Sequence, residues 1–240
     1  MSFQTEIVRL RNSKTSIKNA IEAKGVTVPS NARISDYAGY IEQLGPYEDD
    51  MSLVKTLMGD PQLTLIEIPD AAQVTKTADY LFGKIGFNAV TKVILPSTLQ
   101  QIGTGSFSKV GGNNLEVDAT KCTQLTTLLT GAFKSIKGVL DLRNTKITTI
   151  PDTCFNYVYL TSIVFPSTLT SFVNKSTVFS DNSTLTSLTF FSTTPPTIIS
   201  STFSPLKSLQ HIYVPAESVD TYKTANNWSR HASKISAIQS

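Results

Sequence analysis

Residues 160–179 read LTSIVFPSTLTSFVNKSTVF and contain the pattern that recurs along most of the chain. A short apolar ladder comes first, a proline follows it, two further apolar positions come next, and Phe179 closes the stretch. Because proline has no N–H to donate to a sheet, Pro166 marks the end of a short strand. The stretch therefore predicts a strand-and-turn unit that is closed by a buried aromatic ring.

The same pattern returns before and after this stretch. The closing phenylalanines stand 26, 22, 24 and 24 residues apart, at Phe107, Phe133, Phe155, Phe179 and Phe203. One short strand cannot bury its apolar side chains alone, whereas stacked units form a continuous core in which each unit contacts its neighbours. This period, with a strand core of the L-x-x-I-x-F type, predicts a leucine-rich solenoid. A β-sandwich of short strands is the alternative, but it requires no aromatic residue at a fixed phase.

The units resemble BspA-like leucine-rich repeats, a family common on surface proteins of anaerobic bacteria and in some phage and protist proteins. Residues 93–107, VILPSTLQQIGTGSF, carry the likeness most closely, and residues 131–133, GAF, repeat the unit ending of that family. Residues 212–223, IYVPAESVDTYK, with Trp228 and Ile235 after them, are similar to its closing unit, which ends in an amphipathic helix.

The resemblance covers about residues 63–240. It implies an α/β leucine-rich-repeat solenoid of about seven units with a C-terminal helical cap. The units that begin near positions 115 and 140 depart from the family pattern because they lack the proline after the strand.

Residues 5–24 predict a separate helix. Its seam steps by three and four positions and consists of Ile7, Leu10, Lys14, Ile17 and Ile21. This is coiled-coil spacing, but it covers only about two heptads, so that an isolated coiled coil would be marginal. A second helix is expected at about residues 35–44. We interpret the seam as a docking or oligomerisation surface, and it leaves a dimer and a trimer open.

Residues 18–29, KNAIEAKGVTVP, resemble an N-terminal module of phage tail and other virion-surface proteins. In that family the module precedes varied binding domains. The resemblance implies that residues 1–45 are an attachment or oligomerisation module, 46–62 a linker or N-terminal cap, and 63–240 the solenoid. A helical hairpin that caps the first repeat is the alternative, and both interpretations can hold together.

The composition argues against several functions. The 240 residues carry a formal net charge of +3 without a basic cluster, so nucleic-acid binding is not expected. No run of 18 apolar residues is present, so membrane insertion is not expected. Cys122 and Cys154 are interpreted as small core residues, and with His211 and His231 they lack metal-ligand spacing. No phosphate loop or nucleophile motif occurs, and we expect no enzyme activity, no cofactor and no bound metal.

The outward-facing strand residues form the predicted binding face, because the residue between two core positions of a strand points outward. These residues are Glu67, Ile94, Glu116, Asp141, Val164, Thr189 and Tyr213. Glu116 and Asp141 are expected about 4.8 Å apart, the spacing of neighbouring strands, with Arg143 or Lys92 as the cation between them. A metal held by the two carboxylates is the alternative. Tyr213 is the expected aromatic anchor.

These patterns predict a non-enzymatic structural and adhesive protein. We expect a phage virion component, such as a tail fibre, head fibre or decoration protein. Its N-terminal module would bind other virion proteins or form a homotrimer, and its repeats would bind a host-surface protein or glycan. Residues 1–9 contain no apolar export signal, which favours the virion. A bacterial cell-surface adhesin is the alternative, and a glycan depolymerase, which needs paired carboxylates, is the third and least favoured interpretation.

Overall fold

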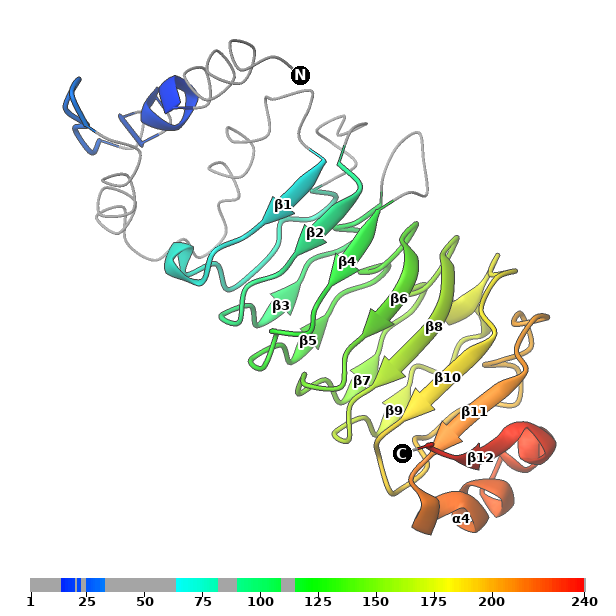
Figure 1. Ribbon diagram of the computed structural model, residues 1–240. Helices are drawn as coiled ribbons and strands as arrows, with labels where there is room; N and C mark the ends of the chain where they lie inside the picture. The colour runs from blue at the N-terminus through cyan, green and yellow to red at the C-terminus, as the bar shows by residue number, and fades with distance from the viewer. Residues whose placement is uncertain are drawn as a thin grey trace.

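A computed structural model describes residues 14–19, 21–22, 25–32, 64–81, 90–108 and 115–239. Short strands dominate the described repeats (Figure 1). The strands are β1 (Leu65–Glu67), β2 (Lys92–Ile94), β3 (Gln101–Ile102), β4 (Glu116–Asp118), β5 (Thr127–Leu128), β6 (Lys137–Asp141), β7 (Thr149–Ile150), β8 (Tyr159–Phe165), β9 (Ser171–Phe172), β10 (Ser187–Phe190), β11 (His211–Val214) and β12 (Ile235–Ala237). The α-helix of this part is α4 (Val219–Thr224), and 3-10 turns lie at Asp70–Ala72, Ser176–Phe179, Ala216–Ser218 and Ser229–Lys234.

The strands stack side by side in chain order and pair in parallel. One three-stranded sheet has the order β1-β2-β4, and a five-stranded sheet has the order β12-β11-β10-β8-β6. Two smaller pairs, β3-β5 and β7-β9, lie on the other side of the core (Figure 1). Such parallel stacking, with few helices, makes this part of the chain an α/β repeat protein.

Apolar residues at equivalent strand positions form continuous rows in the core. Ile66, Val93 and Val117 are partners in successive strands of the first sheet and are 0–6% exposed. In the second sheet the corresponding row is Leu140, Ile163, Leu188, Ile212 and Ile235. Because successive strand residues point to opposite faces, the alternating pattern fixes which side of each strand enters the core.

The closing phenylalanines form the expected stack inside the core. Phe107 and Phe133 lie with ring centroids 5.8 Å apart, and Phe133 and Phe155 lie 6.0 Å apart, both nearly parallel. The column continues from Phe155 to Phe179 at 5.3 Å and from Phe179 to Phe203 at 5.8 Å. The first four rings are stacked from unit to unit, and the last pair, Phe179 and Phe203, is tilted with planes at 54°.

The C-terminal segment covers the last unit of the stack. Tyr222 of α4 and Trp228 are fully or almost fully buried, and both rings contact Phe190. Polar side chains of this segment donate to backbone carbonyls of earlier residues, from Tyr222 to Ser192, Asn227 to Ile198, Trp228 to Pro196, Arg230 to Ser200 and Lys234 to Leu209. The segment consists of α4, a 3-10 turn and strand β12, and the sequence pattern did not predict that strand.

The N-terminal residues that the structure describes form a small separate cluster. Residues 14–19 and 21–22 are helical. Ile21 is fully buried and groups with Val28 and Ala32, while Ile17 packs against them. Of the predicted seam, Ile7 and Leu10 lie outside the described residues, as do the expected helix at 35–44 and the linker at 46–62. The expectation of a docking or oligomerisation seam stays a prediction.

An insertion in β6 separates the two larger sheets. The bridge between Leu115 and Ile136 aligns the starts of the two segments, and Lys137 N donates to the carbonyl of Leu115 at 2.9 Å. Their ends are aligned by matching turns, because Ala119 and Leu142 each accept a hydrogen bond from the N–H three residues on. Four positions separate Leu115 from Ala119, whereas six separate Ile136 from Leu142. The β6 segment is therefore two residues longer.

These extra residues cannot be accommodated in flat strand pairing. Gly138 has a φ of 87°, a left-handed value that favours glycine, and the register of β6 against β8 shifts between Gly138 and Val139. Val139 is 60% exposed as a result. Past the Leu115–Ile136 bridge, β4 and β6 belong to different sheets.

Candidate functional site

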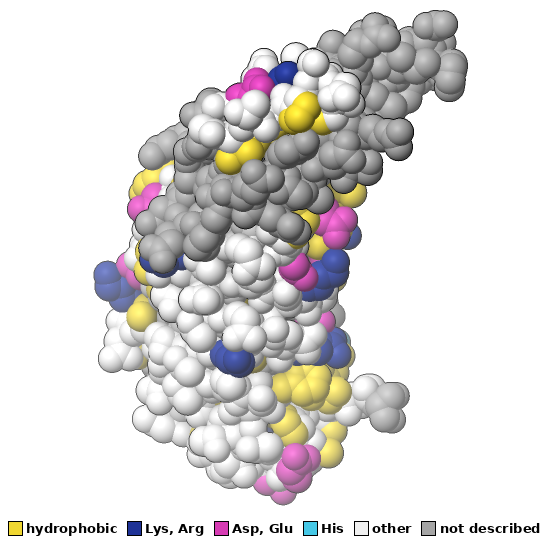
Figure 2. Space-filling model, turned by 90° about the vertical axis from the view of Figure 1, so that its left-hand side faces the viewer, with side chains coloured by type: hydrophobic (Ala, Val, Ile, Leu, Met, Phe, Trp, Pro, Cys, Tyr) yellow, Lys and Arg dark blue, Asp and Glu magenta, His cyan; other side chains and the backbone are white. Residues whose placement is uncertain are grey.

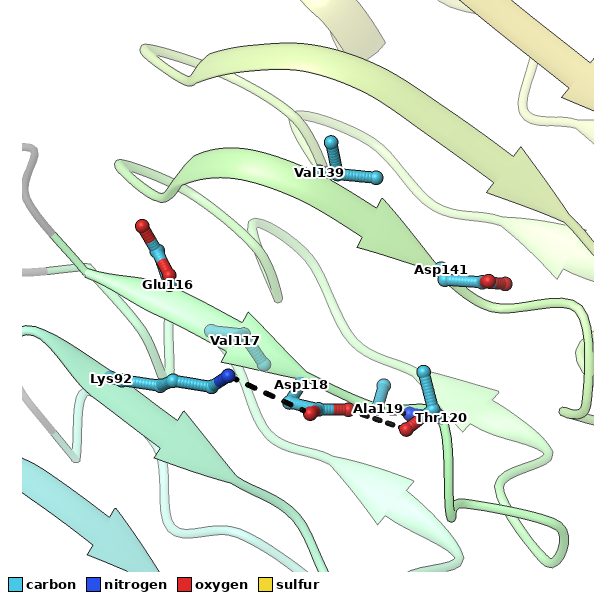
Figure 3. A pocket seen from close by; sticks show the side chains of 8 residues that line it. All are labelled: Lys92, Glu116, Val117, Asp118, Ala119, Thr120, Val139 and Asp141. Atoms are coloured by element: carbon cyan, nitrogen blue, oxygen red, sulfur yellow. Dashed lines mark hydrogen bonds and ion pairs between the residues drawn. The ribbon is translucent and has the colours of Figure 1, made fainter.

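A pocket of about 220 Å³ opens on the outer face where β4 and β6 separate (Figure 3). Its side chains come from β2, β4, the turn after β4, and β6. The lining residues are Lys92, Glu116, Val117, Asp118, Ala119, Thr120, Val139 and Asp141. The two-residue insertion in β6 therefore brings three carboxylates to one hollow.

Asp118 lines this pocket and is held by its neighbours. Its Oδ1 accepts from the Thr120 hydroxyl at 2.6 Å and from the Thr120 N–H at 3.1 Å. Lys92 Nζ lies 3.9 Å from Asp118 Oδ2. Burial raises the pKa of Asp118, but the hydrogen bonds from Thr120 and the charges of Lys92 and Lys121 outweigh it and hold that pKa below its usual value. Asp118 is therefore an ionised acceptor at neutral pH.

The other two carboxylates also have cationic partners. Glu116 Oε1 lies 4.0 Å from Lys137 Nζ. Asp141 accepts from Arg143 Nε at 2.8 Å and from the Arg143 N–H at 3.0 Å. Pairs this exposed contribute only about 0–1 kcal/mol each to stability. Their main consequence is a pocket whose charges are balanced, with donors and acceptors side by side.

The Arg143 guanidinium also reaches across the neighbouring unit. Its Cζ lies 5.3 Å from the ring centroid of Phe191, within the range of a cation–π contact. The expectation that Arg143 or Lys92 lies between Glu116 and Asp141 is corrected. Arg143 pairs with Asp141 and Lys92 lies near Asp118, whereas the cation recorded beside Glu116 is Lys137.

In the first sheet, β1-β2-β4, the residues of the predicted face lie in two different rows. Glu67 and Ile94 are partners, and the partner of Ile94 on β4 is Asp118. Glu116 instead aligns with Lys92, which aligns with Leu65. The expectation that Glu116 continues the row of Ile94 is therefore corrected.

The difference follows from which residues of β4 enter the core. The pair Val117 and Ala119 corresponds to Val93 and Leu95, so the residue between the two core positions is Asp118. Leu115 is also buried, which made Glu116 look equivalent in sequence.

The second half of the predicted face does form one row. Asp141, Val164, Thr189 and Tyr213 are successive partners on β6, β8, β10 and β11. Val164 is only 8% exposed, so it offers little surface to a ligand, contrary to the expectation. The Tyr213 ring stacks on His211 with centroids 5.6 Å apart and planes at 16°. Neither Thr189 nor Tyr213 lines the pocket.

Sequence reasoning missed three residues around the pocket. The sequence analysis chose Glu116 instead of Asp118. Asp118 and Asp141 are each followed by an apolar residue and then a turn, and this shared pattern could have identified Asp118. Val139 is exposed because of the two-residue insertion in β6, which the sequence analysis did not detect. Tyr159, the β8 partner of Lys137, is 49% exposed and lies outside the pocket lining.

One face of the described part of the chain carries few charged side chains. Figure 2 shows one face on which most described side chains are neither charged nor hydrophobic, and on which Lys and Arg side chains are scattered. Among the described residues, no group of three or more His, Cys, Asp or Glu side chains is placed to hold a metal ion.

Both cysteines lie in the core, as predicted. Cys122 and Cys154 are free and fully buried. Burial raises the pKa of Cys122 to about 12 and raises that of Cys154 as well. Neither thiol is a ready nucleophile at neutral pH.

No helix in the described part of the chain is long and apolar enough to span a bilayer.

Two comparisons with known proteins bear on the chain. No curated protein matches it. The model of the BspA-type leucine-rich repeat region matches residues 55–186 and 123–233, with six copies. The match spans well over half of the chain and agrees with the stacked strands and aromatic column described above. This chain therefore belongs to the BspA-type leucine-rich repeat family.

Proposed function

We propose that this chain is a non-enzymatic solenoid that presents its outer sheet face to a partner on a biological surface. The supporting observation is the outer face itself, where charged, hydroxyl and aromatic side chains project from rigidly paired strands. Glu67, Asp118 and Tyr213 are examples, and each is anchored by a buried neighbour in the same strand. Repeat stacks use such extended surfaces for binding.

Several observations fit a binding role better than catalysis. The pocket carboxylates are each paired with a cation or hydroxyl. The pKa of Asp118 is lowered, which is the opposite of the raised pKa that a general acid requires. The two cysteines are buried and the described residues contain no metal cluster.

Two locations are proposed for the protein, the phage virion and the bacterial cell surface. The likeness of residues 18–29 to virion-surface modules favours a phage virion component, with residues 1–45 docked to other virion proteins or assembled as a homotrimer. The family itself is equally compatible with a bacterial cell-surface adhesin. Peptide mass spectrometry of purified particles and of a cell-surface digest from the source distinguishes the two forms, because the chain is found in one fraction and not in the other.

Surface binding is tested with the fluorescently labelled full chain and intact bacterial cells in flow cytometry. The double variant Asp118→Asn and Tyr213→Ala changes the outer face, and we expect it to reduce cell binding at least fivefold. The matched control, Thr126→Ala with Thr170→Ala, changes two exposed residues of the short-strand side. Equal loss in both double variants, or binding that no variant reduces, contradicts the proposal.

A further inference from the structure

The pocket between β4 and β6 is small and lies in a gap of the sheet. Its volume of about 220 Å³ corresponds to about seven water molecules at roughly 30 Å³ each. Pockets for drug-sized ligands are larger, at about 300–1,000 Å³. The pocket is therefore suited to one ring-sized group and not to a peptide chain or a large cofactor.

The charges of the pocket argue for a neutral ligand. Glu116 lies 4.0 Å from Lys137 and Asp141 lies 2.8 Å from Arg143. Asp118 lies 3.9 Å from Lys92. Because each carboxylate is already compensated, neither a cation nor an anion gains a full unpaired countercharge there. What remains is an alternation of strong acceptors and strong donors.

This alternation matches a group that donates and accepts at once, and hydroxyl groups do both. Vicinal hydroxyls of a sugar present such pairs at the spacing of neighbouring side chains. The sheet gap adds backbone groups to the polar lining, because β4 and β6 belong to different sheets. A bound polyol can satisfy backbone groups that water occupies otherwise.

Apolar and aromatic surface lies beside the polar pocket. Val139 lines it and is 60% exposed. Tyr159, 49% exposed, is the strand partner of Lys137, whose Nζ lies 4.0 Å from Glu116 Oε1. Since strand partners point to the same side of a parallel sheet, the Tyr159 ring lies on the outer face beside Lys137, one strand away from the pocket lining of β6. An amphipathic aromatic ring of this kind offers a flat surface for the apolar face of a pyranose.

We infer that the pocket between β4 and β6 binds a neutral sugar residue. Asp118 and Asp141 accept from its hydroxyls, Lys92 donates to them, and Tyr159 packs against the adjoining part of the glycan. This inference rests on the proposed binding function and specifies the chemistry of its partner as a neutral glycan. Binding is expected to be weak for a single sugar, because so small a pocket buries little surface.

The inference is tested by saturation-transfer difference NMR on the full chain. The probes are N-acetylglucosamine and the methyl glycosides of glucose, galactose and mannose, at millimolar concentration. We expect saturation of the ring protons of at least one of them, and titration gives its Kd. Asp118→Asn and Tyr159→Ala are each expected to raise that Kd at least fivefold. Circular dichroism shows that each variant is folded.

Asp152→Asn is the matched control. Asp152 resembles Asp118 because it also accepts from a threonine hydroxyl, that of Thr177, and lies 3.0 Å from a lysine, Lys175. It does not line the pocket. The control is expected to bind the sugar as the native chain does. If Asp152→Asn weakens binding as much as Asp118→Asn, the pocket assignment is wrong.

Charged probes provide the opposing outcome. Methylguanidinium and methyl phosphate, whose methyl protons report saturation, are titrated in the same way. Preference for either over all four neutral sugars overturns the inference, and so does the absence of transfer to any sugar. Cell binding that persists without sugar binding leaves the proposed surface function standing, whereas sugar binding without cell binding removes that function and keeps the site.

Discussion

The ring of Phe133 lies between those of Phe107 and Phe155, with centroids 5.8 Å and 6.0 Å away and interplanar angles of 6° and 5°. All three rings are fully buried. Stacking at this distance couples three successive units, because one ring contributes to two unit interfaces. The aromatic column is thus the part of the core on which the length of the stack depends.

Phe133→Ala is expected to lower the free energy of unfolding by about 3–5 kcal/mol, the usual cost of truncating a buried phenylalanine. Urea denaturation followed by circular dichroism measures it. Phe191→Ala, at a half-buried ring outside the column, serves as the control with a smaller expected loss. A loss at Phe133 no larger than that at Phe191 contradicts the role given to the column.

Gly138→Ala is expected to destabilise the protein by about 1–2 kcal/mol, the cost of holding a side chain in a left-handed backbone conformation. Gly138 has a φ of 87°, although the atoms that a Cβ there would meet within 4 Å are side-chain atoms of Glu116, the nearest being Cγ at 3.5 Å, an ordinary contact. The cost therefore comes from the backbone and not from crowding. Thermal unfolding with Val139→Ala as the neighbouring control tests this, and equal stability of Gly138→Ala and the native chain would falsify the strain.

The repeat architecture was predictable from the sequence because it depends on strong periodic signals. Phe107, Phe133 and Phe155 recur at similar spacing, and proline after a strand, as at Pro166, marks its end. These features act within one unit or between neighbouring units. The interpretation of Cys122 and Cys154 as small core residues is confirmed.

The pocket was not predictable in the same way. It depends on the extra length of β6 relative to β4, and a difference of two residues between units is invisible until their turns are aligned. Leu115 is buried, as the pattern suggested. However, the β4 residue that aligns with Val93 is Val117 and not Leu115. The expected row therefore contained Glu116 instead of Asp118. Pairing register is a property of two segments, and one segment alone does not determine it.

Acidification is expected to destabilise the protein through His231. Burial, together with the charges of Arg230 and Lys234, lowers the pKa of His231. The unfolded chain therefore binds a proton more readily than the folded chain, so that the contribution of His231 to stability is full above its unfolded pKa of about 6.5 and is lost as pH falls toward its folded pKa. Melting temperatures recorded from pH 7.5 to pH 5 measure this loss.

The neutral variant His231→Gln separates this effect from the carboxylates. The pKa values of Asp118 and Asp152 are lowered in the folded chain. Protonation of these two carboxylates therefore reduces the free energy of unfolding only at more acidic pH, below the usual range of aspartate. Between pH 7.5 and pH 5 the variant is expected to melt at a temperature that changes less with pH than that of the native chain. Parallel pH profiles of the two chains contradict the assignment.

The closing segment is expected to depend on Tyr222 for a hydrogen bond as well as for packing. Its ring is fully buried, and its hydroxyl donates to the carbonyl of Ser192 at 2.8 Å. Tyr222→Phe keeps the ring and leaves that carbonyl without its donor, which costs about 1–3 kcal/mol when the group stays dry. Tyr213→Phe, a half-exposed tyrosine on β11, is the control and is expected to be nearly neutral. Equilibrium unfolding in urea compares the two variants. A Tyr222→Phe chain as stable as the control would mean that the cap is held by packing of Tyr222 and Trp228 alone, without a net contribution from this bond.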